Sequence, residues 1–172
     1  MTPQFRTERL LLRRLEWTDA RSLTVWRNDA ACRRYQCWKQ RSLPPLRCFV
    51  LRYRRSRLFS LQREQHYAIC LRDGALIGDV TIFFLRNDSV SIGYTIFPPF
   101  QRNGYAYELL SALLPQLHEV YRLDIFALVH PENIASISLL KKLDFFLSQE
   151  NYEENADVYT LPYRKQKGST AT

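Results

Sequence analysis

The sequence predicts a single α/β (α+β) domain in which helices flank a mixed, mostly antiparallel central sheet. Three observations support this prediction: the composition suits one buried core, strand-like and helix-like segments are interspersed, and neither a linker nor a repeat divides them. The chain has 172 residues, of which 46% are hydrophobic and 13% aromatic, which is ample for a substantial core. We expect the domain to span residues 1–164 and residues 165–172 to form a disordered tail.

The composition also narrows the class of function. The sequence has no run of about 18 apolar residues, and arginines interrupt its start, so we expect a cytoplasmic protein without membrane attachment. The four cysteines and three histidines lack the spacing of a zinc site or a disulfide framework, so we expect no metal and buried or half-buried free thiols. The net charge of +8 favours anionic partners. We interpret the arginines between Arg33 and Arg63 as a solvated helix face rather than a nucleic-acid-binding patch.

The first third of the chain predicts one strand and two helices. Residues 9–15 are short and rich in leucine, which favours a strand. Thr18-Asp19 then predicts a helix start, and residues 19–29 place three apolar side chains on one helical face: Ala20, Leu23 and Trp26. A second helix is expected from about Ser42, because the prolines that follow are tolerated in a first turn.

Three consecutive strands are predicted next, over residues 66–74, 75–84 and 89–97. Asp73-Gly74 is a strong hairpin signal, and Asn87-Asp88-Ser89 supplies another turn. The third strand alternates apolar residues with small or polar ones. We therefore expect an antiparallel meander.

The rest of the chain predicts a long helix, a strand, a short helix and two final strands. The long helix is expected from Tyr105 to Tyr121, kinked at Pro115. Its apolar stripe consists of Leu109, Leu110, Leu113, Leu114, Leu117 and Val120. The later segments are a strand at residues 122–130, a helix opened by Asn133, and strands at residues 145–151 and 157–163.

The stretch FPPFQRNGYA, residues 97–106, joins the meander to the long helix. Pro98 and Pro99 end the hydrogen-bond ladder because proline has no N–H. Gly104 permits a conformation closed to other residues, and the amides from Arg102 to Ala106 then lie where a helix start has no intrahelical acceptors. Such amides bind anions. Taken alone, this stretch is equally typical of an ordinary strand–turn–helix connection.

QRNGYA, followed about 30 residues later by NIASISLLKKLDF, resembles the GNAT superfamily of acyl-CoA-dependent N-acyltransferases. Within it, the chain is most similar to the ribosomal-protein-alanine N-acetyltransferase branch, through TERLLLRRLEWTDA, IGY and the Asn-x-Ala-Ser motif. The resemblance covers residues 7 to about 162 and implies that two central strands splay apart to admit pantetheine. The cofactor-binding residues that it implies are Ile96, Phe97, Gln101, Arg102, Asn103, Gly104, Tyr105, Ala106, Asn133 and Ser136.

The resemblance also suggests roles in the chemistry. The pyrophosphate would rest on the amides from Arg102 to Ala106, Asn133 would contact the pantetheine arm, and Ser136 would lie near the sulfur as the candidate general acid. Asn133 is equally a good helix N-cap, and Ser136 in a first turn is equally able to bond locally to the backbone. A backbone N–H around Phe97 is the expected oxyanion donor.

Two departures from the family pattern leave the general base unknown. The branch commonly has Glu before Ile-Gly-Tyr, but this chain has Ser91, and the tyrosine that serves as general acid in many members aligns with Leu140. Three other groups near predicted strand ends are interpreted as ordinary surface residues: Asp79, His130 and Glu132.

Two further positions matter for the fold more than for the chemistry. Tyr94 follows the apolar alternation of its strand and is expected in the core. Asp144 replaces the usual glycine near the end of the short helix, where aspartate tolerates a left-handed conformation better than most residues.

The sequence thus favours an enzyme that transfers an acetyl group from acetyl-CoA to a primary amine by direct attack on the thioester. The acceptor is left open between a protein N-terminus and a small amine such as a polyamine, an amino acid or an aminoglycoside. The basic character weakly disfavours a polycationic acceptor. The second hypothesis is a non-catalytic CoA-binding module, and the third is a basic RNA-associated protein. Nucleic acid is not expected as a substrate, and both a monomer and a homodimer remain open.

Overall fold

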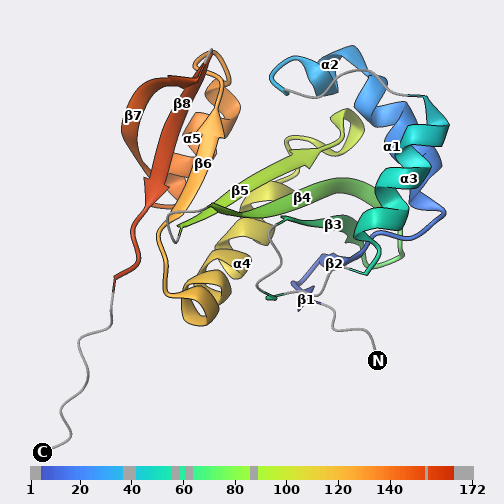
Figure 1. Cartoon of the computed structure of the whole chain (residues 1–172), viewed down its shortest axis with the longest axis horizontal. Coiled ribbons are helices and arrows are strands. Elements are labelled where there is room, and N and C mark those ends of the chain that lie inside the picture. Colours follow the sequence, from blue (N-terminus) through green and yellow to red (C-terminus); the bar gives the residue numbers. More distant parts are fainter. Residues whose placement is uncertain are drawn as a thin grey trace, which may run out of the picture.

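The computed structural model describes residues 5–36, 42–55, 59–60, 64–85, 89–153 and 155–164. Within them, eight strands form one open sheet with helices on both faces (Figure 1). The strands are β1 (Phe5–Arg6), β2 (Leu10–Arg14), β3 (Glu64–Leu71), β4 (Leu76–Leu85), β5 (Ser89–Ile96), β6 (Ile125–Val129), β7 (Phe146–Glu153) and β8 (Ala156–Leu161). The helices are α1 (Asp19–Asn28), α2 (Ala30–Arg33), α3 (Leu43–Tyr53), the 3-10 turn η1 (Pro98–Phe100), α4 (Tyr105–Tyr121) and α5 (Ile134–Lys142).

The sheet has the strand order β1-β2-β3-β4-β5-β6-β8-β7. Neighbouring strands are antiparallel except β5 and β6, which are parallel and are connected through α4. This matches the predicted mixed, mostly antiparallel sheet, and β3, β4 and β5 form the predicted meander. The parallel β5–β6 pair therefore joins two antiparallel parts of the sheet.

Each face of the sheet has its own core. One cluster packs α4 and α5 against the strands and includes Tyr67, Ile82 and Leu113. The other packs α1 and α3 against the opposite face and includes Leu23 and Phe97. Alternating strand residues therefore serve two separate layers, and β3 contributes to both, with Tyr67 and Ile69 in the first cluster and Ala68 and Cys70 in the second.

Most of the predicted elements are confirmed, with additions and one error. The short β1, α2 and η1 were not predicted. Val120 does not belong to the buried stripe of α4, because its side chain is 46% exposed. The other five stripe residues, Leu109, Leu110, Leu113, Leu114 and Leu117, are buried as predicted. Helix α4 continues through Pro115.

Several predicted turns have the expected backbone. Gly74 closes the hairpin between β3 and β4 with φ +95°, and Asp144 takes the left-handed conformation with φ +63°. Ser42 is the N-cap of α3, as predicted. The predicted turn residues Asn87-Asp88 and the predicted tail at residues 165–172 lie outside the described residues.

Candidate functional site

Strands β5 and β6 separate soon after they meet. Their parallel ladder registers only Val90 with Ile125 and Ser91 with Phe126, although β5 continues to Ile96. Figure 1 shows the two ribbons close together at one end and diverging towards the other. The sheet therefore splays at its centre, as the resemblance implied, and part of the β5 backbone has no strand neighbour on that side among the residues that the structure describes.

The alternation of the backbone identifies which β5 amides face this gap. The amide of Val90 donates to the carbonyl of Asp124, on the β6 side, and the amide of Phe97 donates to the carbonyl of Ile77 in β4 at 2.8 Å. Because successive N–H groups point to opposite sides of a strand, the even-numbered residues, including Ile96, direct theirs towards the splay. The Phe97 amide is therefore not a free oxyanion donor, which corrects the expectation for that position.

The side chains at this strand end are buried rather than exposed to a ligand. Phe97 is fully buried and stacks on Trp26, with ring centroids 5.4 Å apart. Ile96 is 8% exposed and belongs to the opposite core. Contact of either residue with a ligand in the splay would consequently be made through the backbone.

The turn before α4 has the predicted open helix start. Gly104 occupies the N-cap position with φ +78° and has no side chain to cap the first amides. Arg102 is also left-handed, with φ +60°, and its side chain is exposed. The amide groups of Gln101 and Asn103 hold the turn by donating to backbone carbonyls, at 2.8 Å for Gln101 to Ile96. The amides at this helix start and the positive end of its dipole suit an anion.

Arg9, the residue that precedes β2, is distant in sequence but makes hydrogen bonds to this turn and to α4. Its Nε donates to Glu108 at 2.6 Å and its Nη1 to the carbonyl of Asn103 at 3.1 Å. The guanidinium also lies over the ring of Tyr105, 4.7 Å from its centroid. Burial would raise the pKa of Glu108, but hydrogen bonds from Thr7 and Arg9 outweigh it, and the pKa is lowered. The Glu108 carboxylate is thus ionised, and its hydrogen bonds are made with Thr7 and Arg9. Because Arg9 balances its charge, the turn stays electropositive.

Asn133 and Ser136 lie in the first turn of α5, the helix that follows β6. Asn133 caps the helix, accepting from the amide of Ser136 at 3.2 Å, so the capping role is confirmed. The hydroxyl of Ser136 is 2.9 Å from that of Tyr94 on β5. Burial raises the pKa of Tyr94 to about 12. Tyr94 packs at the core as predicted, but its hydroxyl also joins β5 to α5 across the splay.

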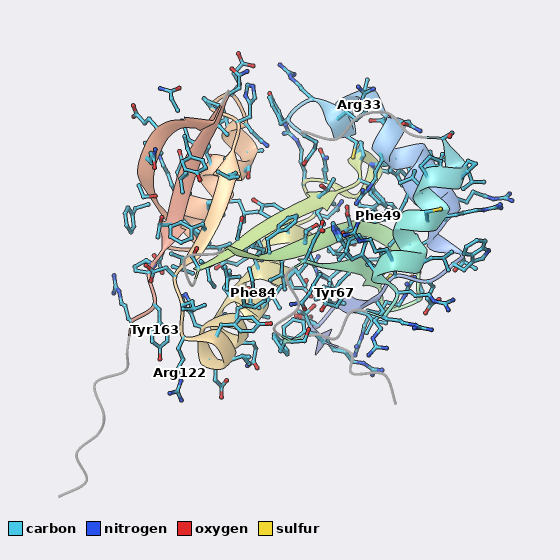
Figure 2. All side chains as sticks on the ribbon, viewed as in Figure 1. Arg33, Phe49, Tyr67, Phe84, Arg122 and Tyr163 are labelled. Atoms are coloured by element: carbon cyan, nitrogen blue, oxygen red, sulfur yellow. The ribbon has the colours of Figure 1, made fainter. Side chains whose placement is uncertain are left out.

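On the other face of the sheet, a cavity of about 770 Å³ lies between the strands and helices α1 and α3. Side chains of β3, β4 and β5 form its floor, and Phe49 of α3 lies between that helix and the sheet (Figure 2). The cavity reaches the splay, because Tyr94 and Thr95 of β5 and Leu128 of β6 are among its lining residues. A molecule in this cavity would therefore have access to the gap between β5 and β6.

A hydrogen-bonded chain of four side chains lies in the cavity. His66 is 6% exposed, and its Nδ1 is 2.9 Å from the hydroxyl of Thr81 while its Nε2 is 2.9 Å from Glu64. The hydroxyl of Tyr53 donates to the other oxygen of Glu64. Burial lowers the pKa of His66. Burial would raise the pKa of Glu64, but the bonds from Tyr53 and His66 outweigh it, and the pKa is lowered.

Asp79 is not the surface residue that the sequence predicted. It is 4% exposed, lines the same cavity and pairs with Arg27 of α1 at 2.5 Å. The sequence interpretation missed this because the pair joins residues 52 positions apart. Glu132 is exposed and His130 half-buried, and neither lines the cavity.

The two positions that depart from the family pattern lie in different places. Ser91 is half-buried at the cavity floor. Leu140 is fully buried in the core beneath α5. Leu140 therefore packs rather than reacts, whereas Ser91 leaves space in the cavity.

The remaining sequence expectations concern thiols, metals and membranes. Among the described cysteines, Cys32 and Cys70 are buried, with burial raising the pKa of each to about 11, whereas Cys48 is exposed. No cluster of His, Cys, Asp and Glu in the described part of the chain is arranged to hold a metal ion. Across the same residues, no helix has the length and apolar character to cross a membrane.

An open mixed sheet with a splayed central pair, and a glycine turn in front of the following helix, are the features of an acyl-CoA-dependent acyltransferase domain. A family model described as an acetyltransferase (GNAT) domain matches residues 9–145, and the chain belongs to that family. The chain is also similar to the uncharacterized N-acetyltransferase YoaA of Bacillus subtilis, at 30% identity over 174 residues, covering 94% of this chain and 97% of that one. The protein is therefore an acyltransferase.

Solved structures share the fold. A GNAT-family acetyltransferase from Bacillus anthracis superposes with a TM-score of 0.79 at 19% identity, covering 94% of this chain and 99% of that one. RimL, a ribosomal L7/L12 alpha-N-protein acetyltransferase in complex with coenzyme A, gives a TM-score of 0.79 at 18% identity, covering 93% and 98%. At these identities the likeness concerns the fold.

Proposed function

We propose that the protein transfers an acetyl group from acetyl-CoA to a primary amine by direct attack of the amine on the thioester. The observation that carries this proposal is the position of the splay between β5 and β6. It lies between the open helix start at Gly104 and the cavity on the α1–α3 face. One side suits the phosphates of a cosubstrate, and the other has room for an acceptor.

The cosubstrate would be held mainly by backbone groups. Its pyrophosphate accepts from the first amides of α4, with the charges of Arg102 and Arg9 nearby. The pantetheine arm lies along the free edge of β5, and Asn133 is its side-chain contact while it also caps α5. Amide groups already oriented by the fold lose little entropy on binding.

Three groups at the splay suit the chemistry of acyl transfer. The amide of Ile96 faces the gap and is the candidate donor to the oxyanion of the tetrahedral intermediate. Ser136 is the candidate general acid for the departing thiolate, and its hydrogen bond to Tyr94 orients it towards β5. A thiol with a pKa near ~8.5 is a tolerable leaving group, so a hydroxyl suffices as its proton donor.

The charges around the cavity favour an acceptor whose amine is not part of a polycation. Arg52 lines the cavity, and Arg47, Arg54 and Arg55 are exposed on or just beyond the same helix, α3. These positive charges on α3 attract acidic groups and repel a polyamine or an aminoglycoside. A polypeptide N-terminus followed by acidic residues suits this charge, and RimL, which shares the fold, is described as acting on the N-terminus of a protein.

Thiol release from acetyl-CoA tests the proposal. The protein is mixed with acetyl-CoA and a panel of amines that includes peptides with acidic and basic sequences after the N-terminus. Amine-dependent release, fastest with an acidic peptide, is the expected result. Stabilisation by CoA without release across the panel would instead favour a non-catalytic CoA-binding module, for which the serine at position 91 is the supporting observation.

A further inference from the structure

The general base that the family pattern places at position 91 is absent from this chain, yet the cavity holds a carboxylate in the same cross-sheet row. In the β3–β4–β5 meander, Glu64 pairs with Phe83, and Phe83 pairs with Ser91. Because adjacent strands lie about 4.8 Å apart, Glu64 is about 10 Å from Ser91, on the same face of the sheet. His66 and Thr81 occupy the next row, which ends at Gly93 of β5.

We propose that Thr81, His66 and Glu64 form a proton relay that removes the first proton from the acceptor amine. This inference rests on the proposed function and identifies the base that it lacks. Thr81 is the group that touches the amine, and His66 receives the proton through it. Glu64 and Tyr53 position the imidazole.

The hydrogen-bond partners determine the direction of this relay. An ionised carboxylate only accepts, so the Nε2 of His66 carries the proton that bonds to Glu64. The Nδ1 is then unprotonated and accepts a hydrogen bond from the hydroxyl of Thr81. The hydroxyl oxygen of Thr81, which lines the cavity, keeps lone pairs for the hydrogen of an ammonium or of a bridging water.

Space for the amine exists at the end of the relay. Thr81 is the direct cross-strand partner of Gly93, and such partners have Cβ positions about 5 Å apart. Gly93 is exposed although it lies in a central strand, and no described atom is within 4 Å of the place where its Cβ would be. The cavity that contains Gly93 is also lined by Thr95 of β5 and Leu128 of β6, so it opens onto the splay. An amine over Gly93 is therefore next to the expected position of the thioester.

The surroundings keep the imidazole neutral and ready to accept a proton. Its ring is 4.2 Å from that of Tyr53 and 4.7 Å from that of Phe49, both on α3, and 6.1 Å from that of Phe83 on β4. The charged groups that face it are Glu64 on its own strand, Asp79 on β4 and Arg27 on α1. Burial dominates and lowers the pKa of His66, so the ring is uncharged at neutral pH.

The proton balance of the reaction is complete with this relay. The ammonium gives one proton to Thr81 as the hydroxyl proton of Thr81 passes to Nδ1 of His66, and the imidazolium later releases it to water. The neutral amine then forms the C–N bond, and the C–S bond breaks with its electron pair on sulfur. The second N–H proton is lost from the tetrahedral intermediate and reaches the thiolate by way of Ser136.

The test compares the pH dependence of kcat/KM for the unaltered protein, His66→Gln and Thr81→Val, with Thr81→Ser as the matched control. With the base in place, kcat/KM is expected to be flat above the lowered pKa of His66. Without it only the neutral amine reacts, so kcat/KM rises about tenfold per pH unit up to the pKa of the amine, which is near ~8 for a peptide N-terminus and ~10 for an alkylamine. If the two profiles meet at the pKa of the amine, the loss at pH 7 is about 1,000-fold with an alkylamine and about tenfold with a peptide N-terminus.

The same experiment separates this inference from the proposed function. Thr81→Ser keeps the hydroxyl and should keep the flat pH profile that Thr81→Val loses, and the affinity for CoA, measured by calorimetry, should be unchanged in all variants. Profiles for His66→Gln and Thr81→Val that match the unaltered protein would overturn the relay while the acetyltransferase stands. If His66→Gln fails to fold, equal rates for Thr81→Val and Thr81→Ser would overturn it. Absence of amine-dependent release from the unaltered protein would overturn the proposed function and the relay together.

Discussion

The turn that precedes α4 and the cavity on the α1–α3 face adjoin the same strand, β5, but they are built in different ways. The turn, residues 97–106, is one continuous stretch held by backbone geometry, with Gly104 as its critical residue. The cavity is assembled from residues of four strands and two helices that are distant in sequence. The first kind of site is visible as a motif, and the second becomes visible only when the strands are registered.

This difference separates the two halves of the proposed reaction. Backbone amides bind a phosphate whatever side chains surround them, so the turn can be shared by many acyltransferases. Side chains in the cavity decide which amine enters and how it loses its proton. We therefore expect substitutions in the turn to affect the affinity for CoA, and substitutions in the cavity to affect turnover at unchanged affinity.

The largest expected effect is that of Gly104→Val on CoA binding. The left-handed φ of +78° is strained for a β-branched residue, and the added side chain obstructs the approach of the pyrophosphate to the amides. We expect a loss of affinity of about 100-fold, equivalent to ~2.7 kcal/mol, in a calorimetric titration with CoA. Gly74→Val is the control, because Gly74 has φ +95° in a hairpin between β3 and β4. Equal affinity losses in both variants would show that strain, not the phosphate site, is responsible.

Gly93→Val tests the cavity side of the comparison. A Cβ at Gly93 meets open space and its φ is not left-handed, so the fold should tolerate the change. The valine would fill the proposed position of the amine, and we expect kcat/KM for the acceptor to fall about tenfold or more, the size of effect typical of steric exclusion from a pocket. Affinity for CoA should stay within about twofold of that of the unaltered protein. A variant that lost CoA affinity but kept its acceptor kinetics would place the acceptor elsewhere.

The same distinction explains what could be predicted from the sequence. The turn, the Asn133 cap and the splayed strand pair were predicted because each depends on a local motif or on the family resemblance that it supports. The buried Asp79–Arg27 pair was missed because nothing local distinguishes a buried aspartate in a strand from an exposed one.

Strand register limited the prediction in two further ways. The chain from Thr81 to Glu64 depends on the pairing of His66 with Thr81, which a single sequence does not specify. The expectation of a free amide at Phe97 was wrong for a similar reason, because the side of the strand to which each N–H points follows from the pairing with β4.

Arg9→Gln is expected to weaken CoA binding to a smaller degree. The substitution removes the brace between β2, Asn103 and Glu108, together with one positive charge beside the turn. About half of the Arg9 side chain is exposed, so solvent and salt screen its charge. We expect a loss of about three- to tenfold, shrinking as ionic strength rises. Arg122→Gln is the control of equal charge, since Arg122 follows the last residue of α4 (Figure 2). A helix of 17 residues places it about 25 Å from the turn. Similar losses in both variants would assign the effect to overall charge.

The smallest expected effect is a pH dependence of stability that comes from the cavity and not from the turn. Burial lowers the pKa of His66 below its ordinary value near 6.5, so the unfolded chain binds its proton more readily than the folded protein. Stability from this group is full above about pH 6.5 and is lost as the pH falls towards the lowered value, by ~1.4 kcal/mol per unit of pKa shift at most. His118 contributes in the same direction, whereas the lowered pKa of Glu64 acts only below about pH 4.5. The melting temperature should therefore fall from pH 7.5 to 5.5, and His66→Gln should remove part of that fall. An unchanged slope in His66→Gln would mean that the fold does not lower the pKa of His66, and the flat part of the kcat/KM profile would then begin nearer the ordinary value of about 6.5.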